Sequence, residues 1–472
     1  MNNIDLATHF KPDAIQDAYQ KYKKEKTDRF DPSKITIPMG ADGITWQDFE
    51  HNLSANARNI SRRVLNGTYQ FYPFREVDIP KPDGGKRTLS IASIRDALVQ
   101  RQLYEALYKS AETMFAQPKF DKVSFAYRRG KSAPYVANLI WRSFKQSNYT
   151  YAFDADIRKF FDTLDHDRLN LLIEDWVGAN TIEGKLLWRF IRTDKVPYNS
   201  YPHGQGWKKY FMTTKPVRVS RSEGVPQGGV LSGLLANLYL YEFDQWVINE
   251  LGLQFNIRYY RYADDFVILT RCQQDAREIY GLNGIENGPV TVKLQEIFLK
   301  IHPDKTDIKH ISSQGLNFVG FEFTNNKVRA RPRNIQRFKN RFIVALFKEP
   351  SLKSKSKQWQ KRLSLTVRFC INPKIVGYEP DICDICGLPK ESRRNWAAFF
   401  SAVVSDVDQL RQIDRWMRKK VSKYFRDRYR TRLRRKDFRK AGMKSLVGEY
   451  YRQRNSQTEL CHCIVNLQVS NP

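Results

Sequence analysis

Two adjacent carboxylates, Asp264 and Asp265, stand between two apolar segments of the chain. These flanks, residues 255–262 and 266–269, are rich in aromatic and β-branched residues, a pattern that predicts the strands of a hairpin with the acidic pair at its turn. Two like charges between apolar strands become favourable when a divalent cation neutralises them, and Mg²⁺ prefers carboxylate oxygens. The pair therefore predicts a metal site, and a solvated Asp-Asp turn is the alternative.

A third carboxylate, Asp156, lies in a second β-prone segment, residues 149–157. Two strands that bring three carboxylates to one edge provide what two-metal phosphoryl transfer requires. We expect two Mg²⁺ ions, with Mn²⁺ as an alternative, bound by Asp156, Asp264 and Asp265, with the Ile157 carbonyl as an extra oxygen. One ion would lower the pKa of an attacking 3′-hydroxyl, and the other would hold a triphosphate.

Residues 156–162, Asp-Ile-Arg-Lys-Phe-Phe-Asp, and 262–265, Tyr-Ala-Asp-Asp, resemble motifs A and C of bacterial reverse transcriptases of the group II intron-like lineage. The resemblance implies a right-hand polymerase of the α+β class, with an antiparallel palm sheet, basic fingers, a helical thumb and a basic helical C-terminal extension. It also implies that Phe161 is the steric gate that excludes a 2′-hydroxyl and selects dNTPs. A lone Phe would otherwise be a core residue.

The nucleotide-binding residues implied by the resemblance lie in two further segments. Residues 79–91 predict two strands around a Pro- and Gly-rich tip. Lys81 and Arg87 match the family's nucleotide-gripping positions, although a basic hairpin can also be a solvated tip. Residues 224–237 are very similar to motif B, in which Gln227 would bond the nucleotide or template. The Pro that is usual in group II-type enzymes is replaced by Gly233.

The resemblance also implies contacts to the template, the primer and the leaving pyrophosphate. The basic, aromatic loop 124–132 resembles the family's template contact, and phosphate contact is its expected use. Lys305 matches a motif D lysine that protonates the leaving pyrophosphate or stabilises its charge, and both roles stay open. The expected template and primer contacts are Arg128, Arg129 and Lys131 of loop 124–132, Gly228 of motif B, and Gly320 of residues 318–323, which resemble the primer grip.

The chain carries a formal net charge of +30, from 80 Lys and Arg against 50 Asp and Glu. Such an excess indicates a polyanionic partner, nucleic acid before an acidic membrane surface. The start lacks the pattern of a signal peptide and there is no long apolar run, so we expect a soluble, cytoplasmic protein. We predict a helical N-terminal extension, a fingers and palm core, a thumb and a basic helical C-terminal region at residues 1–72, 73–325, 326–410 and 411–472.

Four local patterns add detail to this division. Thr45 and Asp48 predict the cap of a helix that runs to about Leu65. Residues 182–222 predict an extended fingers insertion, and residues 231–246 predict a helix with one apolar face that backs the palm sheet. In the C-terminal region, apolar residues recur at helical spacing: Leu410, Ile413, Met417, Val421 and Tyr424.

The C-terminal part contains two features that bear on function. Half of residues 411–440 are Lys or Arg, which favours a phosphate-binding face over a merely solvated one. Cys383 and Cys386 form half of a zinc knuckle, with Cys461 and Cys463 as a distant second half, but a structural Zn²⁺ needs four well-placed ligands, and we favour free thiols. The further Cys and His motifs of intron endonucleases are not found, which argues against DNA cleavage.

These observations predict an RNA-directed DNA polymerase that takes dNTPs, an RNA template and a growing cDNA, with no membrane partner. Within the lineage we expect a domesticated enzyme of antiviral (antiphage) defence that copies a dedicated non-coding RNA. A group II intron-encoded maturase is the first alternative, and a catalytically silent RNA-binding or splicing factor is the second. Protein partners and a homo-oligomer stay open.

Overall fold

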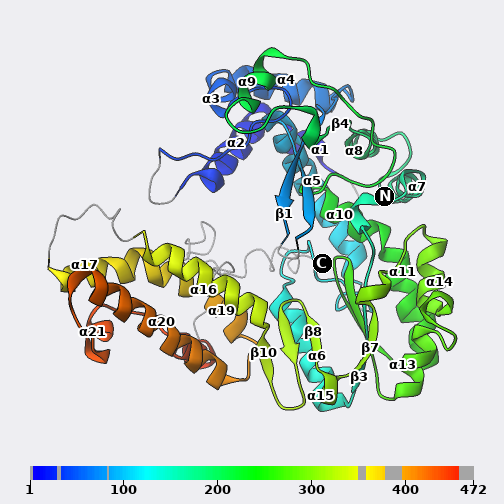
Figure 1. The fold of residues 1–472 in the computed structure, drawn as a ribbon. Coiled ribbons are helices and arrows are strands. Elements are labelled where there is room, and N and C mark those ends of the chain that lie inside the picture. The colour runs from blue at the N-terminus through cyan, green and yellow to red at the C-terminus, as the bar shows by residue number, and fades with distance from the viewer. Residues whose placement is uncertain are drawn as a thin grey trace. The chain divides into compact units, whose positions relative to one another are not determined.

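A computed structural model describes residues 4–28, 33–81, 84–117, 119–348, 358–377 and 396–455. Helices and largely antiparallel sheets both occur in the described chain, in keeping with the predicted α+β class, and Figure 1 labels many of them. The chain divides into two compact units. Unit 1 is made of Met1–Tyr127, Ala155–Phe266 and Arg277–Asp307, and unit 2 of Arg128–Asp154, Val267–Ala276 and Ile308–Pro472.

The N-terminal part of unit 1 is helical, as predicted. A continuous helix expected over residues 46–65 is divided at Asn52, whose backbone leaves the helical region with φ −108° and ψ 25°. Asn offers its backbone side-chain alternatives to the helical hydrogen bond, which explains the break. Thr45 and Asp48 form the predicted capping box. The helices are α1 (Leu6–His9), α2 (Pro12–Lys26), α3 (Trp46–His51), α4 (Leu53–Leu65) and α5 (Ile94–Phe115).

The predicted basic hairpin of unit 1 is formed by β1 (Phe74–Pro80) and β2 (Lys86–Ile91). The strands are antiparallel, and Ile79 lies opposite Arg87. Pro82 and Asp83 at the tip lie outside the described residues. The short strand β4 (Lys195–Val196) joins β1 in parallel and completes a three-stranded sheet.

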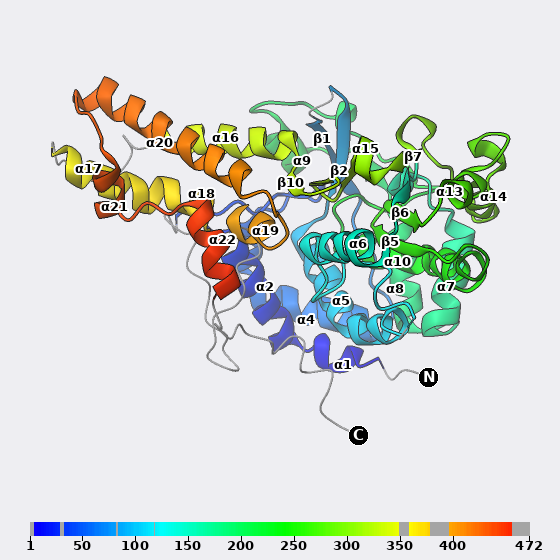
Figure 2. The same cartoon turned by 90° about the horizontal axis from the view of Figure 1, so that it is seen from below.

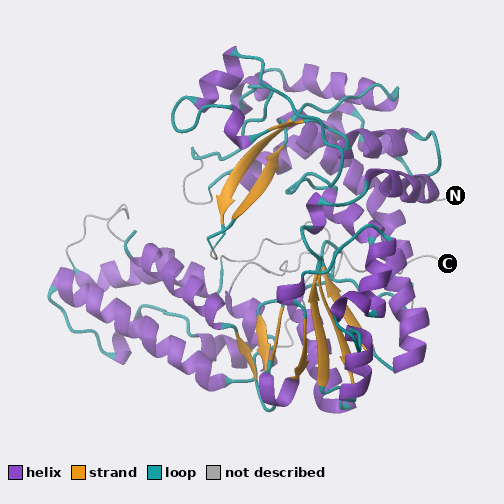
Figure 3. Ribbon diagram, turned by 45° about the vertical axis from the view of Figure 1, so that its right-hand side comes forward, coloured by secondary structure: helices purple, strands orange, loops and turns teal. Residues whose placement is uncertain are grey.

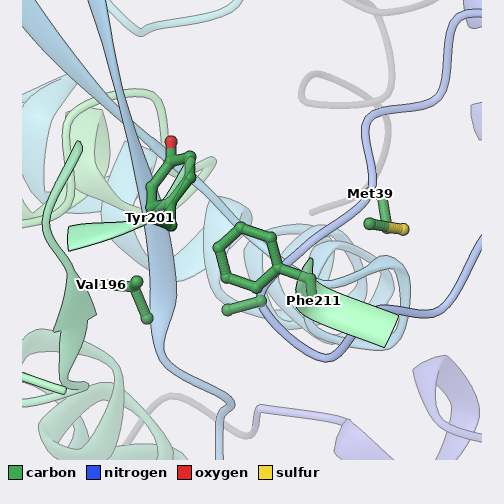
Figure 4. Packing of buried hydrophobic residues seen from close by; sticks show 5 residues of the cluster. Met39, Val196, Tyr201 and Phe211 are labelled. Atoms are coloured by element: carbon green, nitrogen blue, oxygen red, sulfur yellow. The ribbon is translucent and has the colours of Figure 1, made fainter. Parts of the chain in front are cut away.

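Residues 182–222, expected to be an extended insertion, contain regular structure and a small core of their own. Val196, Tyr201 and Phe211 pack with Met39 and Ala41 (Figure 4). Aromatic residues of this polar stretch are therefore packed against the start of the chain. The elements besides β4 are α8 (Ile182–Ile191), η2 (Tyr198–Ser200) and α9 (Trp207–Thr213).

A four-stranded sheet has the order β5-β6-β3-β7 and contains both acidic strands (Figure 3). Its strands are β5 (Arg258–Tyr262), β6 (Asp265–Thr270), β3 (Tyr151–Asp156) and β7 (Asp307–His310). Strand β6 is buried from Phe266 to Thr270, as expected for a central strand covered on both faces. Strands β3 and β6 contribute residues to both units.

The apolar helix predicted over residues 231–246 occurs as two helices in unit 1, separated at Leu240. Every residue of α10 (Ser232–Tyr239) is buried, and α11 (Tyr241–Trp246) follows directly. The other elements that begin in unit 1 are η1 (Phe160–Asp162), α7 (His166–Val177), η3 (Val247–Leu251), α12 (Gly252–Phe255), η4 (Ile285–Asn287), α14 (Pro289–Glu296) and η5 (Pro303–Lys305).

Unit 2 contains a three-stranded sheet and a group of basic helices. The sheet is an antiparallel meander of order β10-β9-β8, and α16 and α20 lie side by side (Figure 1, Figure 2). Its elements are α6 (Ala133–Ser147), α13 (Gln273–Tyr280, shared with unit 1), α15 (Ile311–Gln314), β8 (Leu316–Phe318), β9 (Phe321–Phe323), β10 (Val328–Ala330), α16 (Pro332–Leu346), α17 (Trp359–Thr366), η7 (Val367–Ile371), α18 (Asn372–Ile375), α19 (Trp396–Ser401), α20 (Val407–Tyr429), α21 (Arg435–Lys440) and α22 (Leu446–Asn455).

Helix α20 carries the basic sequence and its apolar stripe. Leu410, Ile413, Met417 and Val421 are buried as their spacing predicts, but the next buried residue is Phe425 and not Tyr424. The helix runs without a break through residue 410, where the sequence suggested a domain boundary, and the four-part division stays a prediction.

Two further expectations concern membranes and cysteines. Among the described residues, no helix combines the length and the apolar character needed to cross a bilayer. The predicted half knuckle, Cys383 and Cys386, and its distant counterpart, Cys461 and Cys463, lie outside the described residues.

Candidate active site

The acidic pair occupies the turn of the hairpin between β5 and β6, where the sequence predicts it. Ala263 has a positive φ of 62°, which suits the first central residue of a two-residue hairpin turn although it is unusual for a residue other than Gly. Asp264 follows in the turn and is partly buried, whereas Asp265 begins β6 and is exposed. The strained turn fixes the direction in which the first carboxylate leaves the sheet.

Asp156 ends β3 beside this turn. The backbone N–H of Ile157 donates to the carbonyl of Asp264 over 3.3 Å. On the other side, the N–H of His302 donates to the carbonyl of Asp156 over 2.8 Å, and Ile157 forms an isolated antiparallel bridge with Ile301. Three segments that lie far apart in the sequence therefore meet at Asp156.

Lys305 reaches the same place because η5 follows the segment that pairs with Ile157. Its Nζ lies 3.2 Å from Oδ2 of Asp156, and its side chain stays 56% exposed. The predicted motif D lysine is thus beside a predicted metal ligand. Its exposure leaves it free to exchange this partner for a phosphate.

The negative charge of Asp264 is only partly compensated by its surroundings. Burial, and then the negative charge of Asp156, raise the pKa of Asp264, while the positive charges of Lys305 and Arg87 act in the opposite direction. The carboxylate is therefore short of compensating positive charge although two cations are near. A divalent cation would remove this deficit.

The carboxylates at this site suit Mg²⁺ that is bound together with a nucleotide. Within the part of the chain that the structure describes, no three acidic, His or Cys side chains lie close enough together to hold a metal ion alone. Mg²⁺ sites at phosphates commonly use one or two protein carboxylates and take their other ligands from water and substrate. Asp156 and Asp264 offer two such carboxylates, and their binding of a metal, like that of Asp265 and the Ile157 carbonyl, stays a prediction.

The predicted gate, Phe161, is held by the motif B segment. Its carbonyl accepts the N–H of Val225 over 2.7 Å. Gly224 adopts φ 73°, and a Cβ there would stand 2.7 Å from the backbone of Asp162, so only Gly allows this approach. Phe161 sits on the 3₁₀ turn η1, as expected, with its ring 5.4 Å from that of Phe160.

Gln227 ties motif B to the elements on either side of it. Its Nε2 donates to Oδ1 of Asp162 over 2.9 Å, and its carbonyl accepts the N–H of Ser90 over 2.8 Å. Gly228 has φ 97°, a conformation that favours Gly. Lys81 and Arg87 are exposed on the hairpin that carries Ser90, and their contacts to a nucleotide stay predictions.

Gly233, which departs from the family pattern, has a local physical reason. A Cβ at this position would stand 2.4 Å from Cγ of Tyr127, far inside van der Waals contact. The Tyr127 ring also meets the ring of Phe161 edge-on, with centroids 6.0 Å apart. Tyr127 therefore fills the space that any larger residue at 233 would need.

A buried polar network beneath the hairpin turn was not anticipated from the sequence. Arg261 is 1% exposed and binds the Asp244 carboxylate through two nitrogens, with its Nε 2.8 Å from Oδ1. The third nitrogen, Nη1, donates to the carbonyl of Ala263 and to Oδ1 of Asn237, each over 3.1 Å. Tyr259 also donates to Asp244. The available signal was a charged residue between two tyrosines in a segment that the sequence predicts to be a strand.

The predicted template and primer contacts lie in unit 2, apart from Gly228. Arg128 is 5% exposed, so its burial argues against the surface phosphate contact expected of it, whereas Arg129 and Lys131 are partly exposed. Gly320 has φ 93°, and a Cβ there would stand 2.8 Å from Nδ2 of Asn334. The glycine is thus explained within the protein, and a primer contact stays a prediction.

Comparison with known proteins agrees with these motifs. Protein YkfC of Escherichia coli is 27% identical over 332 residues, which are 63% of this chain and 78% of that protein. The putative COX1/OXI3 intron 2 protein of Saccharomyces cerevisiae is 25% identical over 68% of this chain. The group II intron-encoded protein LtrA of Lactococcus lactis is 28% identical over 52% of this chain. The aligned parts are 39% and 35% of these two intron proteins.

The model of the family described as reverse transcriptase (RNA-dependent DNA polymerase) matches residues 79–323, about half of the chain. This range includes both acidic strands, the basic hairpin and motif B, which confirms the expected right-hand polymerase fold and RNA-directed DNA polymerase activity. The chain belongs to the reverse transcriptase family, and its curated relatives place it in the group II intron-like lineage.

Proposed function

We propose that Asp156 and Asp264, together with Asp265, hold two Mg²⁺ ions, or Mn²⁺ as an alternative, for the addition of dNTPs to a primer 3′-hydroxyl. The convergence of Asp156 and Asp264 carries this proposal: the N–H of Ile157 donates to the Asp264 carbonyl, and burial and then the charge of Asp156 raise the pKa of Asp264. When bound, the ions would lower the pKa of the hydroxyl and neutralise charge on the triphosphate.

The basic side chains near Asp156 and Asp264 would bind the phosphates of the nucleotide. Lys305 balances the charge of Asp156 at 3.2 Å and is exposed enough to turn to the leaving pyrophosphate, as a proton donor or as a fixed charge. Arg87 offers a bidentate fork and Lys81 a point charge, both from the exposed hairpin. Such an arrangement positions the triphosphate without forming a covalent bond to the protein.

Phe161 selects the sugar. Its backbone is fixed to motif B and its ring to Phe160 and Tyr127, so the ring cannot easily withdraw from a 2′-hydroxyl. We expect Phe161→Ala to raise the use of rNTPs relative to dNTPs by roughly 10- to 200-fold, the range that steric pockets achieve.

Primer extension on RNA and DNA templates tests the metal assignment. Asp264→Ala should abolish extension, and Asp167→Ala, which removes an exposed carboxylate of α7, should retain it. Full extension by Asp264→Ala would refute the assignment. Absence of extension by the unsubstituted protein would favour the alternative of a silent RNA-binding factor.

For the biological role we propose a domesticated enzyme of antiphage defence that copies a dedicated non-coding RNA. Support comes from motif B, where Gly233 is matched to Tyr127 rather than to the usual pattern of intron enzymes. Sequencing RNA that co-purifies with the protein should then yield one recurrent non-coding transcript.

An intron-encoded maturase is the second candidate, favoured by the similarity to LtrA and to the yeast intron protein. Here the co-purified RNA should be a spliced or unspliced group II intron. A mixture without a dominant species would speak against both roles.

A further inference from the structure

The Tyr127 side chain occupies an unusual position on the surface of unit 1. Its backbone has a positive φ of 61°, a conformation that a bulky residue rarely adopts and that commonly signals a functional constraint. Its side chain remains 48% exposed although the ring packs against other residues. A strained, exposed aromatic ring is not explained by core packing.

Three predicted components of the nucleotide site surround this ring. Phe161 meets it edge-on at 88°. Partial burial, and then the negative charge of Asp264, raise the pKa of Tyr127 to about 12, while the charge of Arg87 opposes the shift. The hydroxyl therefore stays protonated at neutral pH and is near both the metal-binding and the phosphate-binding groups.

The Tyr127 ring also lies against Gly233, at a distance that leaves no room for a Cβ. Gly233 is the second residue of α10, and inside helices Gly is less favourable than Ala by about 1 kcal/mol. A Cβ there would stand 2.4, 2.6 and 2.9 Å from Cγ, Cδ1 and Cβ of Tyr127. The helix therefore carries an intrinsically poor residue at the one place where the ring approaches its backbone.

We propose that Tyr127 is a specificity-determining positioning residue, which is seated on Gly233 and holds the Phe161 ring against the sugar of the incoming nucleotide. The proposal rests on the gate assignment made above. It gives the aromatic residue of loop 124–132 a role toward the dNTP sugar, distinct from the template contact expected for that loop.

We expect the discrimination between dNTPs and rNTPs to depend on the ring of Tyr127 and not on its hydroxyl. Removing one partner of an aromatic pair is expected to loosen Phe161 and to raise the rNTP-to-dNTP ratio of kcat/KM by about 2- to 13-fold, the range that corresponds to such a pair. Tyr127→Phe should keep the ratio within about 2-fold, because the ring contacts remain. A merely structural defect would lower both efficiencies and leave their ratio unchanged.

The experiment measures single-nucleotide incorporation of dNTP and rNTP by the full chain. Tyr127→Asn removes the ring while keeping a residue that tolerates positive φ, so it protects the test against misfolding of Tyr127→Ala. Tyr451→Ala, a tyrosine of equal 48% exposure on α22, is the matched control and should leave the ratio unchanged.

Gly233→Ala provides a second route to the same change. The added Cβ must displace the ring, so the ratio should rise as in Tyr127→Asn, and the effects should not add in the double variant. Independent, additive effects would show that the two positions do not act through one contact.

The outcomes separate this inference from the proposed function. If Phe161→Ala shifts the ratio but Tyr127→Asn and Tyr127→Ala do not, the gate stands and the role of Tyr127 is overturned. If Phe161→Ala has no effect while primers are extended, the gate fails and the role of Tyr127 fails with it. If the unsubstituted protein extends no primer, the polymerase proposal itself is overturned, together with this inference.

Discussion

Replacing Arg261 by Met should destabilise unit 1 more than any surface substitution. The change leaves Asp244 buried at 3% exposure without its ion-pair partner and frees the carbonyl of Ala263 at the catalytic turn. Removing one partner of a buried ion pair typically costs about 3–5 kcal/mol. Since Arg261 binds the carboxylate through two nitrogens and holds two further oxygens, we expect a loss in this range.

Urea unfolding, with the midpoint compared at unchanged slope, measures the loss. Lys209→Met is the control, because Lys209 is exposed on α9 of the same unit and its replacement should cost less than about 0.5 kcal/mol. In the double variant Arg261→Met/Asp244→Leu the two losses should not add, since no buried charge remains unpaired. A loss below about 1 kcal/mol for Arg261→Met would refute the view that this ion pair supports the catalytic turn.

Three further predictions concern acidic groups. Because the pKa of Asp264 is raised, its charged form destabilises the fold at pH values above the usual carboxyl range. Asp264→Asn should therefore raise the Tm at pH 7. Added Mg²⁺ should raise the Tm of the unsubstituted protein but not that of the variant. Burial raises the pKa of Asp42 to about 6, so its contribution to stability should decline as pH rises from 4 toward 6, and Asp42→Asn should flatten that part of the Tm profile. Burial raises the pKa of Asp406, but the hydrogen bond and charge of Arg329 outweigh this effect and lower the pKa. Asp406→Asn should therefore reduce the free energy of unfolding by about 1–2 kcal/mol at pH 7. The difference in unfolding midpoint should vanish as the pH falls below the usual carboxyl range.

The sequence was sufficient for the elements that follow from local patterns. The β1–β2 hairpin, the strand before Asp156, the acidic turn and the capping box at Thr45 were all anticipated, because alternation, turn residues and capping chemistry are local signals. Motif spacing also predicted that Asp156 and Asp264 would come together.

What escaped sequence reasoning depends on partners that are distant in the chain. Asn237, Asp244 and Arg261 looked like ordinary helix and strand residues, and only the fold makes them one network. The burial of Arg128 has the same origin, as a basic loop gives no local sign that one of its side chains points inward. The contact between Tyr127 and Gly233 joins two motifs that the sequence presents as separate.

The backbone hydrogen bonds that join residues 300–302 to residues 156–158, here called the backbone clip, have a practical consequence for engineering. Because Lys305 takes its place from that clip, its distance from Asp156 does not depend on the length of the chain that leads to it. The connection between α13 and α14 is a surface loop in which Leu282 is 75% exposed. A peptide tag inserted after Leu282 should therefore leave nucleotide addition intact and provide a handle for immobilising the enzyme on a support.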